Sequence, residues 1–203
     1  HGCRAQLQNK LAEKNINSPL VEGLRVTDAA TMDKVIEAAS LVRSQLETRL
    51  SMGLAPSAMH SMKVRVASAN VITAKPAGII NGVDLQLTGT VRNIDTLAIT
   101  SLLDTGNVVL LSALGYSPSG DCFNLAYDHV ATEIAQSLAA DKLIAFTQLS
   151  GIHDHDGHLI RELTPTSAAR LITDQILAPA MLPLATAAIA AVEGGVPRAH
   201  IMS

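Results

Sequence analysis

Short apolar runs alternate with amphipathic helical patterns along this chain, and this alternation constrains the fold more than any other feature. The runs at 108–111 and 142–146 are apolar at nearly every position, which is typical of parallel strands buried on both faces. Strands of that kind need helices above and below the sheet. The alternation therefore predicts an α/β fold with a mainly parallel central sheet covered on both faces.

The longest helical pattern runs from about residue 27 to residue 52. Apolar residues recur there at three- and four-residue steps, and Thr27 or Asp28 can cap the first turn. A loop is expected at 15–23, and another at 114–125. Further helices are expected at 5–14, from 93 or 95 to 106, at 128–140, from about 166, and at 183–193. Strands are expected at 63–73, at 84–91 with a possible bulge at Gly89, at 108–111, within 142–152, and at 198–202.

Composition and charge exclude several classes of protein. Only 2% of the residues are aromatic and the net charge is −3, so the chain has neither a basic field nor stacking side chains for nucleic acid. The same charge argues against an anionic membrane surface, and no apolar run of about 18 residues could span a bilayer. Two cysteines make no disulfide framework, which favours a cytoplasmic protein.

Ligands of open α/β sheets collect at the carboxyl ends of strands, where helices begin. Gly2 and Arg4 stand at one such helix start, where N–H groups and a guanidinium can hold an anion. The alternative is a glycine turn beside a surface arginine. Arg25 can form a fork to a ligand carboxylate, or a salt bridge to an acidic side chain of the chain itself.

A second helix entrance carries Asn124 and Asp128. Asn124 can orient a ligand amide, whereas helix capping is the favoured role for an acid placed like Asp128. Cys3 and Cys122 lie in no nucleophile motif and are expected to be packed thiols.

Three histidines and two aspartates lie within six residues, from His153 to His158. These are zinc-binding residue types, but their H-x-H-x-x-H spacing matches no common zinc site. The Asp156-Gly157 pair between two apolar flanks is instead typical of a β-hairpin turn. We therefore expect a hairpin and no metal.

The strings "HGCRAQ", "GLRVTD", "GVDLQLTGTVRNID", "ADKLIAF" and "EGGVPRAHI" occur in order along the chain. With them, the chain resembles the amino-acid-kinase domain of the bacterial N-acetylglutamate synthase family. The sister family, N-acetylglutamate kinase, shares "GLRVTD". The resemblance implies a three-layer αβα sandwich of the amino-acid-kinase (carbamate-kinase-like) fold.

Departures from the kinase pattern decide between the two families. The kinase carries a glycine triplet after His1, and here only Gly2 remains, followed by cysteine and Arg4. Asn124 and Asp128 match the kinase pattern. Leu184 stands where the kinase has a lysine, and leucine has no charge to stabilise the transferring phosphoryl group. The resemblance thus implies a kinase fold that has lost kinase chemistry.

The resemblance to the synthase family implies a regulatory and assembly role for this domain. The domain would bind L-arginine as feedback inhibitor and form a homo-oligomer. A separate acetyltransferase domain, expected beyond Ser203, would transfer acetyl from acetyl-CoA to L-glutamate. A strand is expected upstream of His1, because a glycine directly ahead of a helical pattern usually follows a strand.

No catalytic residue and no cofactor are therefore expected in this chain. Five residues are expected to form a vestigial amino-acid or acetylglutamate site, namely Gly2, Arg4, Arg25, Asn124 and Asp128. Two alternatives stay open. One is an active N-acetylglutamate kinase with unusual residues, and the other is a non-enzymatic arginine-sensing module.

Overall fold

A computed structural model describes residues 1–52, 64–147, 151–154, 156–177 and 181–203. The chain forms two compact units, His1–Tyr127 and Asp128–Ser203, here called the first and the second unit. The start of the expected strand at 63–73 and residues 148–150 of the expected strand within 142–152 lie outside the described residues. Among the helices that are described, none is long and apolar enough to cross a membrane.

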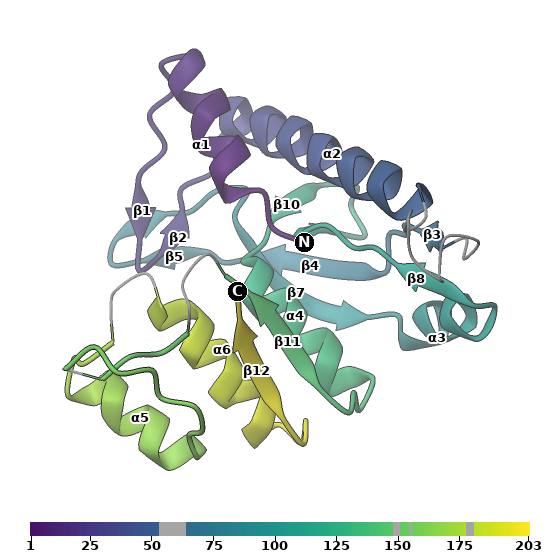
Figure 1. The fold of residues 1–203 in the computed structure, drawn as a ribbon. Coiled ribbons are helices and arrows are strands. Elements are labelled where there is room, and N and C mark those ends of the chain that lie inside the picture. The colour runs from purple at the N-terminus through teal and green to yellow at the C-terminus, as the bar shows by residue number, and fades with distance from the viewer. Residues whose placement is uncertain (53–63, 148–150, 155, 178–180) are drawn as a thin grey trace. The chain divides into compact units, whose positions relative to one another are not determined.

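The first unit contains α1 (Arg4–Glu13), α2 (Ala29–Ser51) and α3 (Thr96–Asp104). These helices were predicted, and their caps explain where two of them begin. The Asp28 carboxylate accepts from the Thr31 N–H at 2.7 Å, and the Asp95 carboxylate accepts from the Ala98 N–H at 2.9 Å. Figure 1 shows α1 lying against the first half of α2. Their contact is a core cluster of Leu7, Leu11, Met32, Val35 and Ala38.

A four-stranded sheet in the order β10-β9-β4-β7 forms the centre of the first unit. Its strands are β4 (Ile72–Pro76), β7 (Gly89–Ile94), β9 (Leu114–Tyr116) and β10 (Cys122–Asn124). β4 and β9 are parallel, whereas β4–β7 and β9–β10 are antiparallel. A separate parallel pair joins β3 (Arg65–Ala67) to β8 (Asn107–Val109).

Two expectations for this region were wrong. The expected loop at 114–125 is the β9–β10 hairpin, closed by a turn in which Ser117 and Ser119 hydroxyls donate to the Asp121 carboxylate. The single strand expected at 63–73 is broken at 68–71, and it resumes as β4. Ser68 and Asn70 account for the break, because their polar side chains are exposed there.

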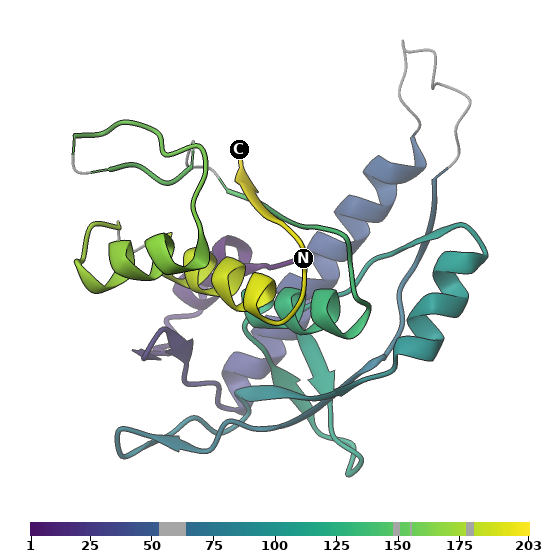
Figure 2. The ribbon, with the colours of Figure 1, turned by 90° about the horizontal axis from the view of Figure 1, so that it is seen from below.

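Two small hairpins project from one side of the first unit (Figure 2). One pairs β1 (Leu20–Val21) with β2 (Leu24–Arg25), and the other pairs β5 (Ile79–Ile80) with β6 (Val83–Asp84). Both turn over two residues with positive φ, and these turns favour the sharp reversal. The tips are joined by the Asn81 amide, which donates to Glu22 Oε1 at 2.8 Å. The expected loop at 15–23 and strand from 84 missed these hairpins.

A possible bulge was expected at Gly89, and this expectation was wrong. Gly89 pairs with Pro76 at the start of β7, and the register shift lies between Thr73 and Ala74. A Cβ on Gly89 would lie 2.7 Å from the Phe123 Cβ and 2.9 Å from the Lys75 carbonyl oxygen. The glycine therefore permits β7 to approach its neighbours closely.

The second unit contains helices α4 (Tyr127–Ser137), α5 (Pro165–Thr173) and α6 (Leu182–Glu193), with α4 beginning at the last residue of the first unit. Strands β11 (Leu143–Phe146) and β12 (Ala199–Met202) pair in parallel. The Thr132 hydroxyl and the Gln136 amide on α4 donate to carbonyls of α6, at 3.1 and 2.7 Å. The α/β class and its parallel strand pairs are thus as predicted.

Burial on both strand faces was expected, and β11 departs from it. Leu143 packs against the buried cluster of Ala135, Ala191 and Val196. Side chains on the opposite face of the strand, Ile144 and Phe146, are 48% and 78% exposed. Within this unit the apolar run therefore predicted the strand correctly and the burial of one of its faces incorrectly.

Candidate functional site

Arg25 and Asn124 are connected through two buried threonines. The Asn124 amide donates to Thr27 Oγ1 at 3.0 Å, and Thr27 Oγ1 lies 2.8 Å from Thr88 Oγ1. The Thr88 hydroxyl then donates to the Arg25 carbonyl oxygen. Since an amide N–H only donates and a carbonyl only accepts, each hydroxyl accepts one bond and donates the next. We call Arg25, Thr27, Thr88 and Asn124 the threonine network.

Local pairing explains why these four residues meet. Thr27 follows β2 and forms a parallel bridge with Gln86, and Thr88 forms a parallel bridge with Asn124. Both threonines are almost fully buried, at 0% and 2% exposure. Thr27 was expected only as one of two candidate caps of α2, a role that Asp28 takes, and Thr88 was not singled out. A threonine that serves as a buried hydrogen-bond link has no periodic or local signature.

The Arg25 guanidinium binds neutral acceptors. Nη1 donates to the Ser18 carbonyl oxygen at 2.8 Å, and Nη2 donates to Gln8 Oε1 at 3.2 Å. Burial, and after it the nearby charge of Arg4, lowers the pKa of Arg25, which nevertheless stays protonated. No acidic partner of Arg25 occurs in the described part of the chain, so the salt-bridge alternative is not what forms there. Arg4 and Arg25 together leave a positive region at the Arg25 end of the threonine network.

Gly2 lies where the chain passes the ring of Tyr127. A Cβ on Gly2 would come within 3.0 Å of two atoms of that ring, so the position favours glycine for steric reasons as well as for any ligand. Burial raises the pKa of the Cys3 and Cys122 thiols, and both pack against the cluster between α1 and α2. These features agree with packed thiols.

Asp128 and Leu184 lie in the second unit. Asp128 is the second residue of α4 and lies inside its first turn, two positions after the N-cap position, so the expected capping role was wrong. Its Oδ1 accepts from the His129 N–H at 3.1 Å. Leu184 lies in the first turn of α6 and is half-buried. Gly2, Arg4, Arg25 and Asn124 all belong to the first unit.

The histidine-rich segment forms the predicted hairpin. His153 pairs antiparallel with Leu159, and Gly157 has a φ of +81° at the turn. Asp154 Oδ1 accepts from the N–H groups of Asp156 and His158, at 3.0 and 2.8 Å. These bonds lower the pKa of Asp154.

The side-chain atoms of Asp154, Asp156 and His158 that could act as metal ligands lie within 4.8 Å of one another. The backbone bonds already engage Asp154 Oδ1, and Asp156 and His158 are exposed. This arrangement is that of an Asx turn. His155 lies outside the described residues.

Parallel strand pairs joined through helices define a protein of the α/β class. The Amino acid kinase family matches residues 1–203, and the chain belongs to that family.

Three proteins illustrate what the chain is similar to. It is 46% identical over 207 residues to an amino-acid acetyltransferase of Pseudomonas putida, a match that covers 100% of this chain and 47% of that protein. It superimposes on N-acetylglutamate synthase from Neisseria gonorrhoeae, complexed with coenzyme A and L-arginine, with a TM-score of 0.93 and 35% identity. That match covers 100% of this chain and 47% of the other.

Carbamate kinase from Giardia lamblia bound to AMP-PNP superimposes with a TM-score of 0.69 and 12% identity, covering 100% of this chain and 75% of that chain. This likeness shows the fold alone. The chain spans about half the length of the curated relatives it matches.

Proposed function

We propose that residues 1–203 are the amino-acid-kinase-like domain of a longer, cytoplasmic amino-acid acetyltransferase of the N-acetylglutamate synthase type. The observation that carries the proposal is 46% identity to an amino-acid acetyltransferase along the whole chain. By contrast, similarity to carbamate kinase is limited to the fold, at 12% identity. The remaining half of such a protein would hold the acetyltransferase domain.

The proposed reaction is acetyl transfer from acetyl-CoA to L-glutamate, in the first step of arginine biosynthesis. The amino nitrogen of glutamate attacks the thioester carbonyl, the C–S bond breaks, and the CoA thiol leaves with the amine's proton. Residues 1–203 are not expected to supply a catalytic group for this step, and acetyl-CoA is a co-substrate rather than a cofactor of this domain.

For this chain itself we propose a regulatory and assembly role, with L-arginine as feedback inhibitor and a homo-oligomer as the assembled state. The Neisseria relative was crystallised with L-arginine, which supports an arginine-responsive domain. Gly2, Arg4, Arg25, Asn124 and Asp128 are proposed as the remnant of an amino-acid or acetylglutamate site. The Arg25 charge lacks an acidic partner among the described residues and favours a carboxylate ligand there.

Leu184 argues against phosphoryl transfer by this domain. Catalysis of that reaction depends on positive groups that stabilise charge on the transferred phosphoryl group. Leu184 lies in the first turn of α6 with a half-buried hydrocarbon side chain, and it supplies no such charge at the position where the kinase family has lysine.

The test uses the full-length protein that contains this chain. With acetyl-CoA and L-glutamate we expect stoichiometric release of CoA thiol and N-acetylglutamate, and D-glutamate serves as the matched control. With ATP and N-acetylglutamate we expect no ADP above background. ADP formation without acetyl transfer would instead identify a kinase. Acetyl transfer that L-arginine does not slow would retain the enzyme assignment and remove the proposed feedback role.

A further inference from the structure

A pocket of about 480 Å³ lies beside α2 in the first unit, within the size range of small-molecule sites. α2 contributes Arg43 and Ser40 to its wall, and the break between β3 and β4 contributes Ser68 and Asn70. Apolar side chains of the lining include Ile36, Ile72 and Leu114. The pocket is therefore amphipathic, with polar groups and an apolar surface in the same space.

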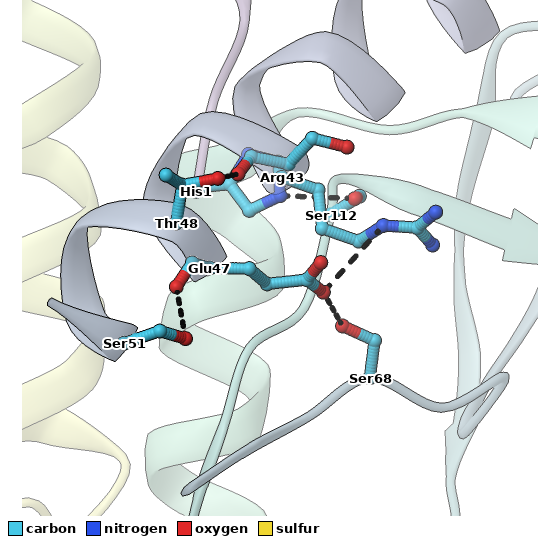
Figure 3. Close-up of polar contacts among 8 residues, drawn as sticks. His1, Arg43, Glu47, Thr48, Ser51, Ser68 and Ser112 are labelled. Atoms are coloured by element: carbon cyan, nitrogen blue, oxygen red, sulfur yellow. Dashed lines mark hydrogen bonds and ion pairs between the residues drawn. The ribbon is translucent and has the colours of Figure 1, made fainter. Parts of the chain in front are cut away.

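Arg43 is held from one side only. Its Nε lies 3.8 Å from Glu47 Oε1, and the same oxygen accepts a hydrogen bond from the Ser68 hydroxyl at 3.1 Å (Figure 3). At 3.8 Å the first contact is an ion pair rather than a hydrogen bond. In the described part of the chain, neither terminal nitrogen of Arg43 donates a hydrogen bond. The guanidinium is thus oriented by Glu47, while its donors stay available.

Among the described lining residues, Arg43 is the one that carries a charge. No acidic residue belongs to the lining among the residues that the structure describes, and Glu47 is not one of the described lining residues. Burial raises the pKa of the Tyr116 hydroxyl, and the positive charge of Arg43 acts in the opposite direction, which places that charge near the phenol. Burial also raises the pKa of Cys122, another lining residue, so that this thiol stays neutral. An anion entering the pocket would meet a cation and neutral hydroxyl groups.

We propose that this pocket binds a small organic carboxylate with an apolar body. Its carboxylate would take the terminal N–H groups of Arg43, whose planar fork matches a carboxylate. Ser40 and Tyr116 offer further hydroxyl groups on the walls. The apolar body would lie against Ile36, Ile72 and Leu114. This site involves none of the four residues of the threonine network, and the inference does not depend on acetyl transfer.

The probe is 3-phenylpropionate, with its uncharged amide as the matched control ligand. Calorimetric titration of the full-length protein should show one-to-one binding of the acid and at least tenfold weaker binding of the amide. Arg43→Gln should weaken binding of the acid about tenfold. Arg49→Gln makes the same charge change at an exposed position outside the pocket on the same helix, and should leave the affinity unchanged.

A second variant keeps the proposal testable if Arg43→Gln folds poorly. Ser40→Leu retains Arg43, adds a helix-favouring residue at an exposed helical position, and fills part of the pocket. It should also weaken binding about tenfold, with a melting temperature near that of the parent. Equal affinities of the acid and the amide, or equal affinities of the Arg43→Gln and Arg49→Gln variants, would overturn the proposal.

Discussion

The side-chain amide of Asn124 donates a hydrogen bond to Thr27 Oγ1 at 3.0 Å, across 97 residues of sequence. This bond joins the end of β10 to the segment that leads into α2. Because Thr27 is fully buried, no water replaces the bond if it is lost. The bond therefore holds the Asn124 side chain against Thr27, two residues from Arg25, and it stabilises the first unit.

Thr27→Val tests this contact with a side chain of nearly the same shape. It leaves the Asn124 amide and the Thr88 hydroxyl each without one partner, and we expect a loss of about 1–3 kcal/mol in free energy of unfolding. Urea unfolding measures the change. Thr48→Val is the control, since Thr48 is exposed on α2 and its hydroxyl donates to the Ser44 carbonyl. The control should stay within about 0.5 kcal/mol of the parent. Similar losses in both variants would contradict the role given to Thr27.

Local signals predicted the helices, and partners distant in sequence explain what was missed. Asp28 and Asp95 cap α2 and α3 through N–H groups three residues away, so a short stretch of sequence contains the whole interaction. The β1–β2 and β5–β6 hairpins have two-residue strands, too short to show an alternating pattern.

Site residues follow the same division. Arg25 and Asn124 were predicted from residue type and from position near helix starts. Their connection was not, because the Thr27 and Thr88 hydroxyls meet across 61 residues. The sequence around either threonine does not indicate this contact, because it forms only when distant strands pair.

Gly89→Ala tests the close approach of β7 to its neighbours. The new Cβ would lie 2.7 Å from the Phe123 Cβ and 2.9 Å from a backbone oxygen of Lys75. Since a backbone atom cannot move aside as a flexible side chain can, we expect a loss of about 1–3 kcal/mol in free energy of unfolding. Gly82→Asn is the matched control. Gly82 has open space and a φ of +78°, which asparagine tolerates, so the control should lose less than about 1 kcal/mol. A larger loss at Gly82 would refute the steric argument.

Arg25→Lys tests the two-sided contact of the guanidinium. Arg25 reaches the Ser18 carbonyl and the Gln8 side chain with two separate nitrogens. Lysine keeps the charge but has a single nitrogen, so it should lose one of these bonds, or about 0.5–1.5 kcal/mol in free energy of unfolding. Arg65→Lys, at an exposed position of β3, should change it by less than about 0.5 kcal/mol. If Arg25→Lys matches that control, the guanidinium contacts do not stabilise the first unit.

The cap of α2 should make stability depend on pH. Hydrogen bonding by Thr31, whose backbone N–H donates to Asp28 Oδ1 at 2.7 Å, lowers the pKa of Asp28 in the folded protein. Ionisation of this carboxyl therefore favours folding. Its contribution is complete above the unfolded pKa of about 3.9 and is lost as pH falls through the lower folded value.

Asp28→Asn and Asp28→Ala separate the cap from its charge. Asparagine caps about as well as aspartate but does not titrate, so Asp28→Asn should change stability little at pH 7 and should remove this pH dependence. Asp28→Ala should cost about 0.5–2 kcal/mol at pH 7, and the cost should shrink as pH falls below about 4, because the protonated parent cap is weaker. Urea unfolding at pH 7, 5, 4 and 3 measures both differences. A deficit for Asp28→Ala that stays constant over this range would show that the charge of Asp28 contributes nothing to the cap.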